Sequence, residues 1–224
     1  MKKAPVFLAL DVNNADQALS LVKQTHPYIF GYKISPRLLF GCGMDIVRNI
    51  QPYGKVFLDF KFHDIPSTTV EAVRSAFHLG VDYVTVHSSV GGTTLKQLAA
   101  LEAELNQTRK FCVLGVTVLS SISGSPDAIH QQVEILAEDV FRSGLKGLVC
   151  SPWEVESLKA KYPQAFLVTP GIRFEGDSPD DQARVMRPLE AMKKGSSALV
   201  IGRSLLREPV KRSQELAKSL ADFC

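Results

Sequence analysis

Eight short apolar segments recur along the chain, and each is followed by a longer segment whose apolar residues have helical spacing. Continuous apolar strands that alternate with helices are typical of a parallel sheet covered by helices. Eight such units within 224 residues predict an α/β fold, a single-domain (β/α)8 TIM barrel over 1–224. A doubly wound open sheet is the alternative, which is weakened because no Gly-x-Gly-x-x-Gly follows the first apolar segment.

The predicted strands are Val6–Val12, Tyr28–Ser35, Lys55–Phe62, Tyr83–Ser88, Phe111–Leu119, Gly147–Ser151, Phe166–Ile172 and Ala198–Ser204. The predicted helices are Ala15–Thr25, Phe40–Gln51, Thr68–Leu79, Thr93–Leu105, Ile129–Ser143, Trp153–Lys161, Gln182–Lys194 and Val210–Phe223. Thr68 and Glu71 have the spacing of a capping box, which predicts a helix start at Thr68. The segment Phe174–Asp181 is predicted as a loop because it contains glycine, proline and several acidic residues.

Composition and charge exclude several classes of function. The formal net charge of +3 is small and evenly spread, which argues against a nucleic-acid partner. The four cysteines lie far apart and no histidine cluster joins them, so neither a zinc site nor a disulfide framework is expected. Because the chain has neither an apolar stretch of bilayer length nor a signal-peptide pattern, we expect a cytoplasmic protein without a membrane partner.

Charged residues stand at the ends of the first three predicted strands. The first strand ends in Asp11 and the second carries Lys33, while the third carries Asp59 and Lys61. Strand side chains alternate between the two faces, so Asp59 and Lys61 are predicted to share one face and to point into the barrel. Chemistry in these barrels gathers at the C-terminal ends of the strands. The four charges together therefore favour a functional site over a structural ion pair.

The ends of the seventh and eighth predicted strands have the residue types of a phosphate site. Barrels of this class commonly bind phosphate at these two strands. Pro170 and Arg173 end the seventh strand, and Gly202 and Arg203 end the eighth. A glycine lets backbone N–H groups approach an anion, and an arginine adds a charge-assisted hydrogen bond.

The segment Asp59–Thr68 reads Asp-Phe-Lys-Phe-His-Asp-Ile-Pro-Ser-Thr, which resembles the Asp-x-Lys-x-x-Asp-Ile-Pro-x-Thr signature of the orotidine 5'-phosphate decarboxylase family. Matches outside the signature run from one end of the chain to the other. They are Leu8–Asp11, Lys33, Val116–Ser120, Thr169–Arg173, Asp181–Gln182 and Val200–Arg203.

The resemblance implies a cofactor-independent lyase that converts orotidine 5'-phosphate to UMP in pyrimidine biosynthesis, with no metal. It implies that Lys61 is the proton donor, that Asp59 lies beside the substrate carboxylate, and that Asp64 is the third catalytic residue. It also implies a homodimer in which Asp64, Ile65 and Thr68 reach into the partner's site. The other substrate-binding residues that it implies are Asp11 and Lys33 for the ribose, Ser120 and Pro170 for the base, and Arg173, Gln182, Gly202 and Arg203 for the phosphate. Phe174–Asp181 would close over the site.

Two other functions fit parts of the sequence. A Mg-dependent sugar-phosphate decarboxylase of the same suprafamily shares the Asp-x-Lys-x-x-Asp core, but it carries a metal-binding Glu on the second strand where this chain has Lys33. A non-catalytic nucleotide-binding barrel would need the phosphate contacts, but it would not need Lys61 between two aspartates.

Overall fold

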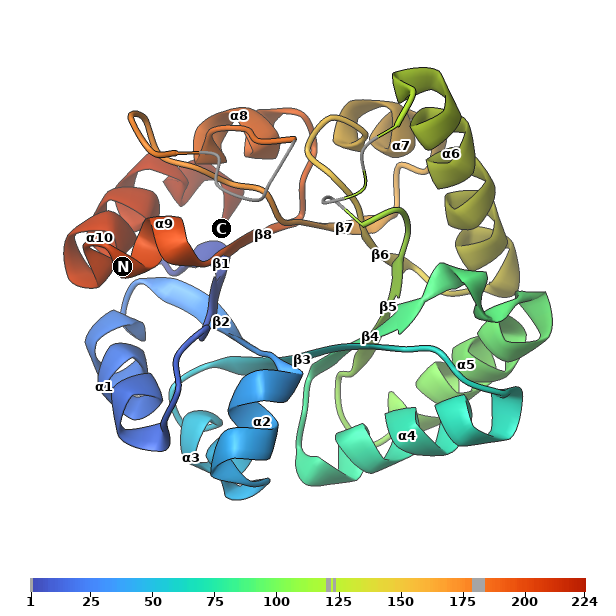
Figure 1. The fold of residues 1–224 in the computed structure, drawn as a ribbon, viewed down its shortest axis with the longest axis horizontal. Coiled ribbons are helices and arrows are strands. Elements are labelled where there is room, and N and C mark those ends of the chain that lie inside the picture. The colour runs from blue at the N-terminus through green and yellow to red at the C-terminus, as the bar shows by residue number, and fades with distance from the viewer. Residues whose placement is uncertain (1, 120–121, 123, 179–183) are drawn as a thin grey trace.

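The computed structural model describes residues 2–119, 122, 124–178 and 184–224. Eight parallel strands close into a barrel in which each strand pairs with the next along the chain and β8 pairs with β1 (Figure 1). The strands are β1 (Ala4–Ala9), β2 (Ile29–Ile34), β3 (Lys55–Phe62), β4 (Tyr83–His87), β5 (Cys112–Val116), β6 (Gly147–Val149), β7 (Phe166–Thr169) and β8 (Ala198–Ile201). The predicted (β/α)8 barrel is confirmed.

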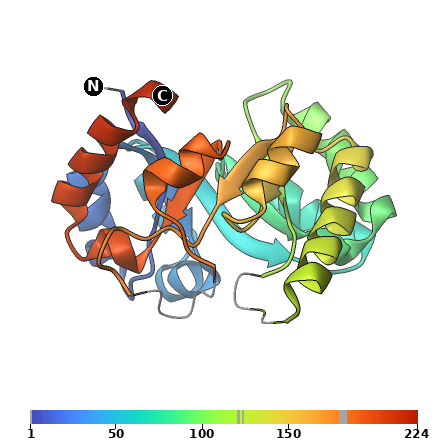
Figure 2. The same ribbon diagram turned by 90° about the horizontal axis from the view of Figure 1, so that it is seen from above.

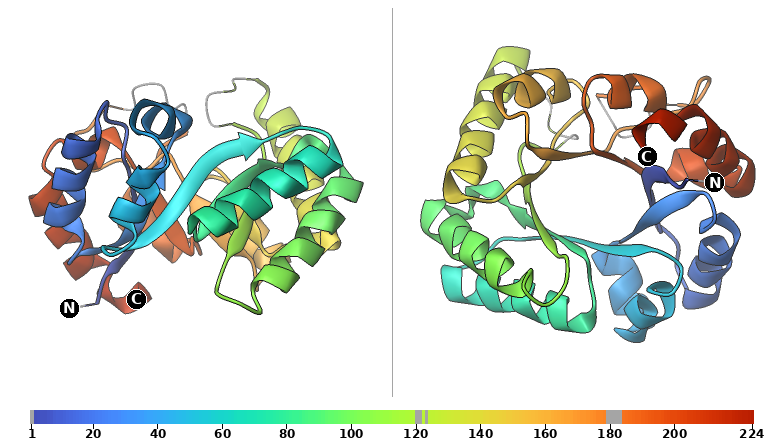
Figure 3. Two further views of the ribbon diagram at one scale, coloured as in Figure 1. Left: turned by 90° about the horizontal axis from the view of Figure 1, so that it is seen from below. Right: turned by 180° about the vertical axis from the view of Figure 1, so that it is seen from behind.

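Helices surround the barrel on its outer side (Figures 2 and 3). They are α1 (Ala15–Thr25), α2 (Pro36–Cys42), α3 (Asp45–Ile50), α4 (Pro66–Leu79), α5 (Gly92–Leu105), α6 (Pro126–Ser143), α7 (Val155–Lys161), α8 (Pro188–Lys193), α9 (Arg203–Leu206) and α10 (Pro209–Ser219), with short 3-10 helices at Ser88–Val90 and Ala221–Phe223. Helix α1 has the predicted bounds, and the side chain of Asn14 caps it by accepting a hydrogen bond from the Gln17 N–H.

Several predicted helix boundaries were wrong, and two of these differences bear on the site. The segment predicted as one helix, Phe40–Gln51, forms α2 and α3, which are separated at Gly43 with a φ of +77°. Helix α4 begins at Pro66 rather than at Thr68, because proline suits the first helical turn with its fixed φ and missing N–H. Thr68 therefore lies inside the first turn, and the predicted capping box does not form.

The strands of the second half end earlier than predicted. Strand β7 ends at Thr169, and β8 ends at Ile201, where Gly202 (φ −106°, ψ −113°) turns the chain directly into α9. Helix α8 begins at Pro188, so the predicted helix Gln182–Lys194 was too long over its described part. Its first residue, Gln182, lies outside the described residues.

Aromatic side chains fill the N-terminal half of the barrel interior. The ring of Phe7 lies 5.1–5.3 Å from the rings of Phe30, Phe57 and Tyr83 in edge-on contacts. Full burial of one such ring stabilises the fold by about 1.5–3 kcal/mol. Phe57 belongs to this interior cluster and also lines a cavity at the C-terminal ends of the strands. The cluster therefore packs directly against that cavity.

The two chain ends lie close together at one end of the barrel (Figure 2). The Lys2 ammonium donates a hydrogen bond of 3.0 Å to the Cys224 carbonyl. Among the helices of the described segments, none combines the length and the apolar character needed to cross a membrane.

Candidate active site

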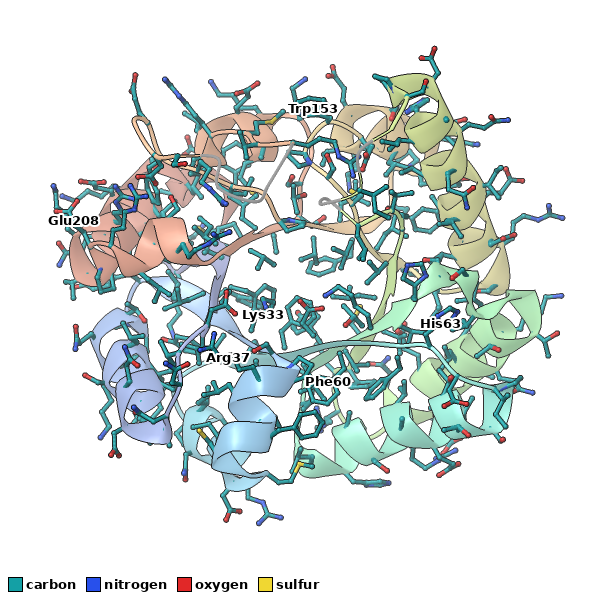
Figure 4. All side chains as sticks on the ribbon, viewed as in Figure 1. Lys33, Arg37, Phe60, His63, Trp153 and Glu208 are labelled. Carbon is teal, nitrogen blue, oxygen red and sulfur yellow. The ribbon has the colours of Figure 1, made fainter. Side chains whose placement is uncertain are left out.

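A cavity of about 220 Å³ opens at the C-terminal ends of the strands. Figure 4 shows Lys33 within the ring of strands, whereas Phe60 and His63 lie outside it. Of the residues predicted from sequence, the cavity is lined by Asp11, Lys33, Asp59, Lys61, Pro170, Arg173, Gly202 and Arg203. The fold thus brings residues of β2 and β3 together with residues that follow β1, β7 and β8.

Asp59 is the centre of a charged network at one end of the cavity. Its carboxylate accepts a hydrogen bond of 2.8 Å from the Lys61 ammonium and lies 3.4 Å from the Lys33 ammonium. Lys33 in turn lies 3.9 Å from the Asp11 carboxylate. The side chains of Asp59 and Lys33 are only 15% and 12% exposed, so the ion pair between these two residues is weakly screened by water.

The carboxyl of Asp59 is held in its charged form. Burial by itself raises its pKa, but the positive charges of Lys33 and Lys61 and the hydrogen bonds from Lys61 and Thr85 outweigh burial. The net effect is a pKa below the usual value of an aspartate. An ionised Asp59 therefore lies beside the Lys61 ammonium and accepts its hydrogen bond.

The backbone of Lys61 leaves the ordinary strand conformation. Its φ is +51°, the only positive φ of a non-glycine residue in the described part of the chain. The pairing of β3 with β4 shifts in register between Leu58 and Phe62, so β3 bends where it carries Lys61. A left-handed residue of this kind costs about 1–3 kcal/mol and persists only where its surroundings hold it.

Thr85 on β4 holds this bend, and we did not predict it from the sequence. Its hydroxyl accepts a hydrogen bond of 2.9 Å from the Lys61 N–H and donates one of 3.0 Å to the Asp59 carboxylate. The side chain is fully buried. The strand alternation could have indicated it. Thr85 is a polar residue two positions from Tyr83, so both side chains lie on the face of β4 that points into the barrel.

The other end of the cavity has the features of an anion site. Arg173 follows β7 and Arg203 begins α9, and both line the cavity beside Gly202. A Cβ atom on Gly202 would lie 3.2 Å from a carboxylate oxygen of Asp11, which leaves little room for any other residue. A glycine at this position also lets backbone N–H groups approach an anion.

The charged groups of the cavity suit an anionic ligand better than a metal ion. Lys33 lies between Asp11 and Asp59, and Lys61 contacts Asp59, so ammonium groups occupy the positions around these carboxylates. In the described segments, no group of three or more His, Cys, Asp or Glu side chains could hold a metal.

Three predicted site residues do not line the cavity of their own chain: Asp64, Ile65 and Thr68. The Asp64 carboxylate accepts a 2.7 Å hydrogen bond from the Ile65 N–H, and Ile65 is 64% exposed. Phe40 and Met44 are also large exposed apolar residues, and the Phe40 ring lies 5.8 Å from that of Phe60 on β3.

The remaining predicted site residues cannot be placed. Ser120, Gln182 and the predicted closing segment from residue 179 onward lie outside the described residues.

A family model described as "Orotidine 5'-phosphate decarboxylase / HUMPS family" matches residues 4–218, nearly the whole barrel. The chain belongs to this family. The matched span contains every described residue that lines the cavity.

Individual relatives of this chain are orotidine 5'-phosphate decarboxylases. An orotidine 5'-phosphate decarboxylase of Pseudomonas fluorescens is 40% identical over 98% of this chain and 95% of its own. One of Pseudomonas savastanoi pv. phaseolicola is 41% identical with the same coverage. The crystal structure of orotidine 5'-phosphate decarboxylase from Lactobacillus acidophilus superposes with a TM-score of 0.80 at 29% identity, covering 97% of this chain and 99% of that one.

Proposed function

We propose that this chain is a carbon–carbon lyase that decarboxylates orotidine 5'-phosphate to UMP in pyrimidine biosynthesis, with Lys61 as the proton donor. The observation that carries the proposal is the Lys61 ammonium, held 2.8 Å from an ionised Asp59 in a cavity whose other end presents two arginines. The proposal places the reaction in the cytoplasm and requires no cofactor.

Lys61 would act on the carbanion. When the bond between C6 and the carboxylate breaks, its electron pair stays on C6 and CO2 leaves. The Lys61 ammonium stabilises this charge while it develops and then transfers a proton to C6. No electron sink is needed, because a fixed cation in a poorly hydrated cavity interacts more strongly than one in water.

Asp59 would serve Lys61 rather than the substrate directly. Its carboxylate holds the ammonium in place by a hydrogen bond and, with Thr85, fixes the bend that aims the side chain. We assign the rate enhancement mainly to stabilisation of the carbanion, and not to repulsion between Asp59 and the substrate carboxylate, which is the weaker of the two explanations.

The remaining cavity residues would bind the parts of the substrate that do not react. Asp11 and Lys33 suit the ribose hydroxyls, and Pro170 suits the base. Arg173, Gly202 and Arg203 suit the phosphate, together with Gln182, and Ser120 would contact the pyrimidine. Binding energy from the remote phosphate lowers the barrier where it helps to assemble the reacting end.

The complete site would need a second subunit. Asp64, Ile65 and Thr68 would reach into the partner's cavity, and the exposed apolar side chains of Phe40, Met44 and Ile65 support an interface on this face. Mixing Lys61→Ala protein with Asp64→Ala protein would then regenerate some intact sites in hybrid dimers. Lack of recovery after confirmed subunit exchange would contradict a role of Asp64 in the partner's site.

The activity itself is tested by the ultraviolet spectrum of orotidine 5'-phosphate incubated with purified protein, with and without EDTA. We expect conversion to UMP at equal rates in both samples. Loss of activity in EDTA that Mg²⁺ restores would favour the metal-dependent sugar-phosphate decarboxylase. Binding without any spectral change would favour a non-catalytic nucleotide-binding barrel.

A further inference from the structure

A cluster of polar and charged residues surrounds the buried carboxylate of Asp177, next to the cavity arginines, and does not itself line the cavity. The Asp177 carboxylate, only 3% exposed, accepts hydrogen bonds of 2.7 and 3.1 Å from the Arg212 guanidinium and one of 3.1 Å from Arg207. It also accepts a hydrogen bond from the Ser204 hydroxyl. We call Asp177, Ser204, Arg207 and Arg212 the Asp177 cluster.

The cluster joins the two segments that carry the cavity arginines. Asp177 lies four residues after Arg173, and Ser204 is the neighbour of Arg203. The N–H of Phe174 donates a 3.2 Å hydrogen bond to the Ser204 hydroxyl and a longer one of 3.4 Å to the Asp177 carboxylate. The residue that follows each arginine, Phe174 or Ser204, therefore donates a hydrogen bond to the same carboxylate.

Helix α10 supplies the cation that completes this arrangement. The Arg212 guanidinium lies over the Phe174 ring, 4.6 Å from its centroid, and also donates to the Ser204 carbonyl. The side chain of Arg212 is only 13% exposed. Burial raises the pKa of Asp177, but hydrogen bonds from Arg212 and Ser204 and the charge of Arg212 outweigh it and keep the carboxyl ionised.

Holding α10 on the barrel does not require this ion pair. The helix already buries Leu216 and Ala217 against the core, and Leu220 is buried just beyond its end. Burial of two charges and their alignment by several hydrogen bonds is costly unless the geometry is well satisfied. The ion pair between Asp177 and Arg212 is therefore better explained by a role in positioning the neighbouring residues than by a role in holding α10 on the barrel.

We propose that Asp177, Ser204 and Arg212 are positioning residues, which set the spacing between Arg173 and Arg203 so that both can contact one phosphate group. The inference rests on the proposed function, because it assumes that these arginines bind the substrate phosphate. None of the three positioning residues would touch the substrate.

The test compares a substrate that has the phosphate with one that lacks it. Asp177→Asn should lower kcat/KM for orotidine 5'-phosphate by about 30-fold or more, a size typical of breaking one buried charge pair. It should change kcat/KM for orotidine by less than about 3-fold, since orotidine makes no phosphate contact. Asp45→Asn is the matched control, because it removes an exposed carboxylate that also pairs with an arginine, and it should leave both values unchanged.

A double mutant separates positioning from general destabilisation. If Asp177 acts through Arg203, then Asp177→Asn should cost much less in an Arg203→Ala background than in the wild type. Ser204→Ala should shift the two substrates in the same selective way as Asp177→Asn, but by a smaller factor. Calorimetric titration with UMP and uridine gives the same comparison without turnover, with only UMP binding weakened.

The outcomes distinguish the two proposals. A wild-type protein that neither converts orotidine 5'-phosphate nor binds UMP more tightly than uridine would overturn both. An active wild type with Asp177→Asn unchanged, or with equal losses on both substrates, would overturn the positioning role alone.

Discussion

Replacing Thr85 with valine tests how the reacting end of the cavity is held. Valine has nearly the shape of threonine, so the buried site keeps its volume while the hydroxyl is lost. That hydroxyl makes two contacts, one with the Lys61 N–H at 2.9 Å and one with the Asp59 carboxylate at 3.0 Å. The variant therefore leaves a backbone donor unpaired at a residue with a φ of +51°.

The size of the effect follows from the kind of hydrogen bond that is lost. A hydrogen bond to a charged group contributes about 1.5–3 kcal/mol. If this free energy is lost from the stabilisation of the transition state, kcat/KM should fall roughly 10- to 150-fold. The pKa of Asp59 should also rise, because one of the donors that lower it is gone. The acid limb of the pH profile should therefore move to higher pH.

Thr85→Ser is the matched control. Serine keeps the hydroxyl and loses one methyl group, which should cost stability of about 1 kcal/mol and little activity. The assay is steady-state decarboxylation of orotidine 5'-phosphate across pH, with thermal unfolding measured in parallel. Equal kcat/KM for the valine and serine variants would refute the idea that this hydroxyl holds Asp59 and Lys61 in place.

Two further predictions concern other parts of the barrel. Arg203→Ala should lower kcat/KM for orotidine 5'-phosphate by about 2 kcal/mol or more, though less than removal of Lys61; an unchanged steady-state value would exclude its phosphate role. Burial raises the pKa of Glu102 to about 7, despite a hydrogen bond from the Val113 N–H. Folding raises the pKa of Glu102 and therefore favours its protonated carboxyl. The stability that this carboxyl contributes is fully present below the unfolded-state pKa of 4.5, and it is lost as pH rises through the folded-state pKa of about 7. Glu102→Gln should therefore gain stability relative to the wild type between pH 5 and pH 8 in urea unfolding, and a difference that does not vary with pH would contradict this.

The barrel could be predicted because its signal is repeated. Eight alternations of apolar run and helical segment leave few alternative folds, even where single boundaries such as the start of α4 are wrong. Asp59 and Lys61 could be singled out because each stands at a strand end, and the fold brings strand ends together. The parts of the site that depend only on strand order were therefore accessible from the sequence.

The supporting contacts were not accessible in the same way. The bend at Lys61 is fixed by Thr85 from the neighbouring strand, and the spacing of the two arginines involves Asp177 and Arg212, which are 35 residues apart. Such contacts depend on side-chain geometry between elements, which periodicity does not encode. Asp64 is a different case, because its predicted role lies in another subunit, beyond what one chain can contain.

The most direct test of the central claim is the ultraviolet assay on orotidine 5'-phosphate with wild-type protein and with Lys61→Ala, each checked for binding of UMP. We predict that the wild type forms UMP and that Lys61→Ala is slower by at least about 1,000-fold while it still binds UMP. A wild type without activity, or a Lys61→Ala protein within about tenfold of the wild type, would contradict the assignment of Lys61 as the group that stabilises and protonates the carbanion.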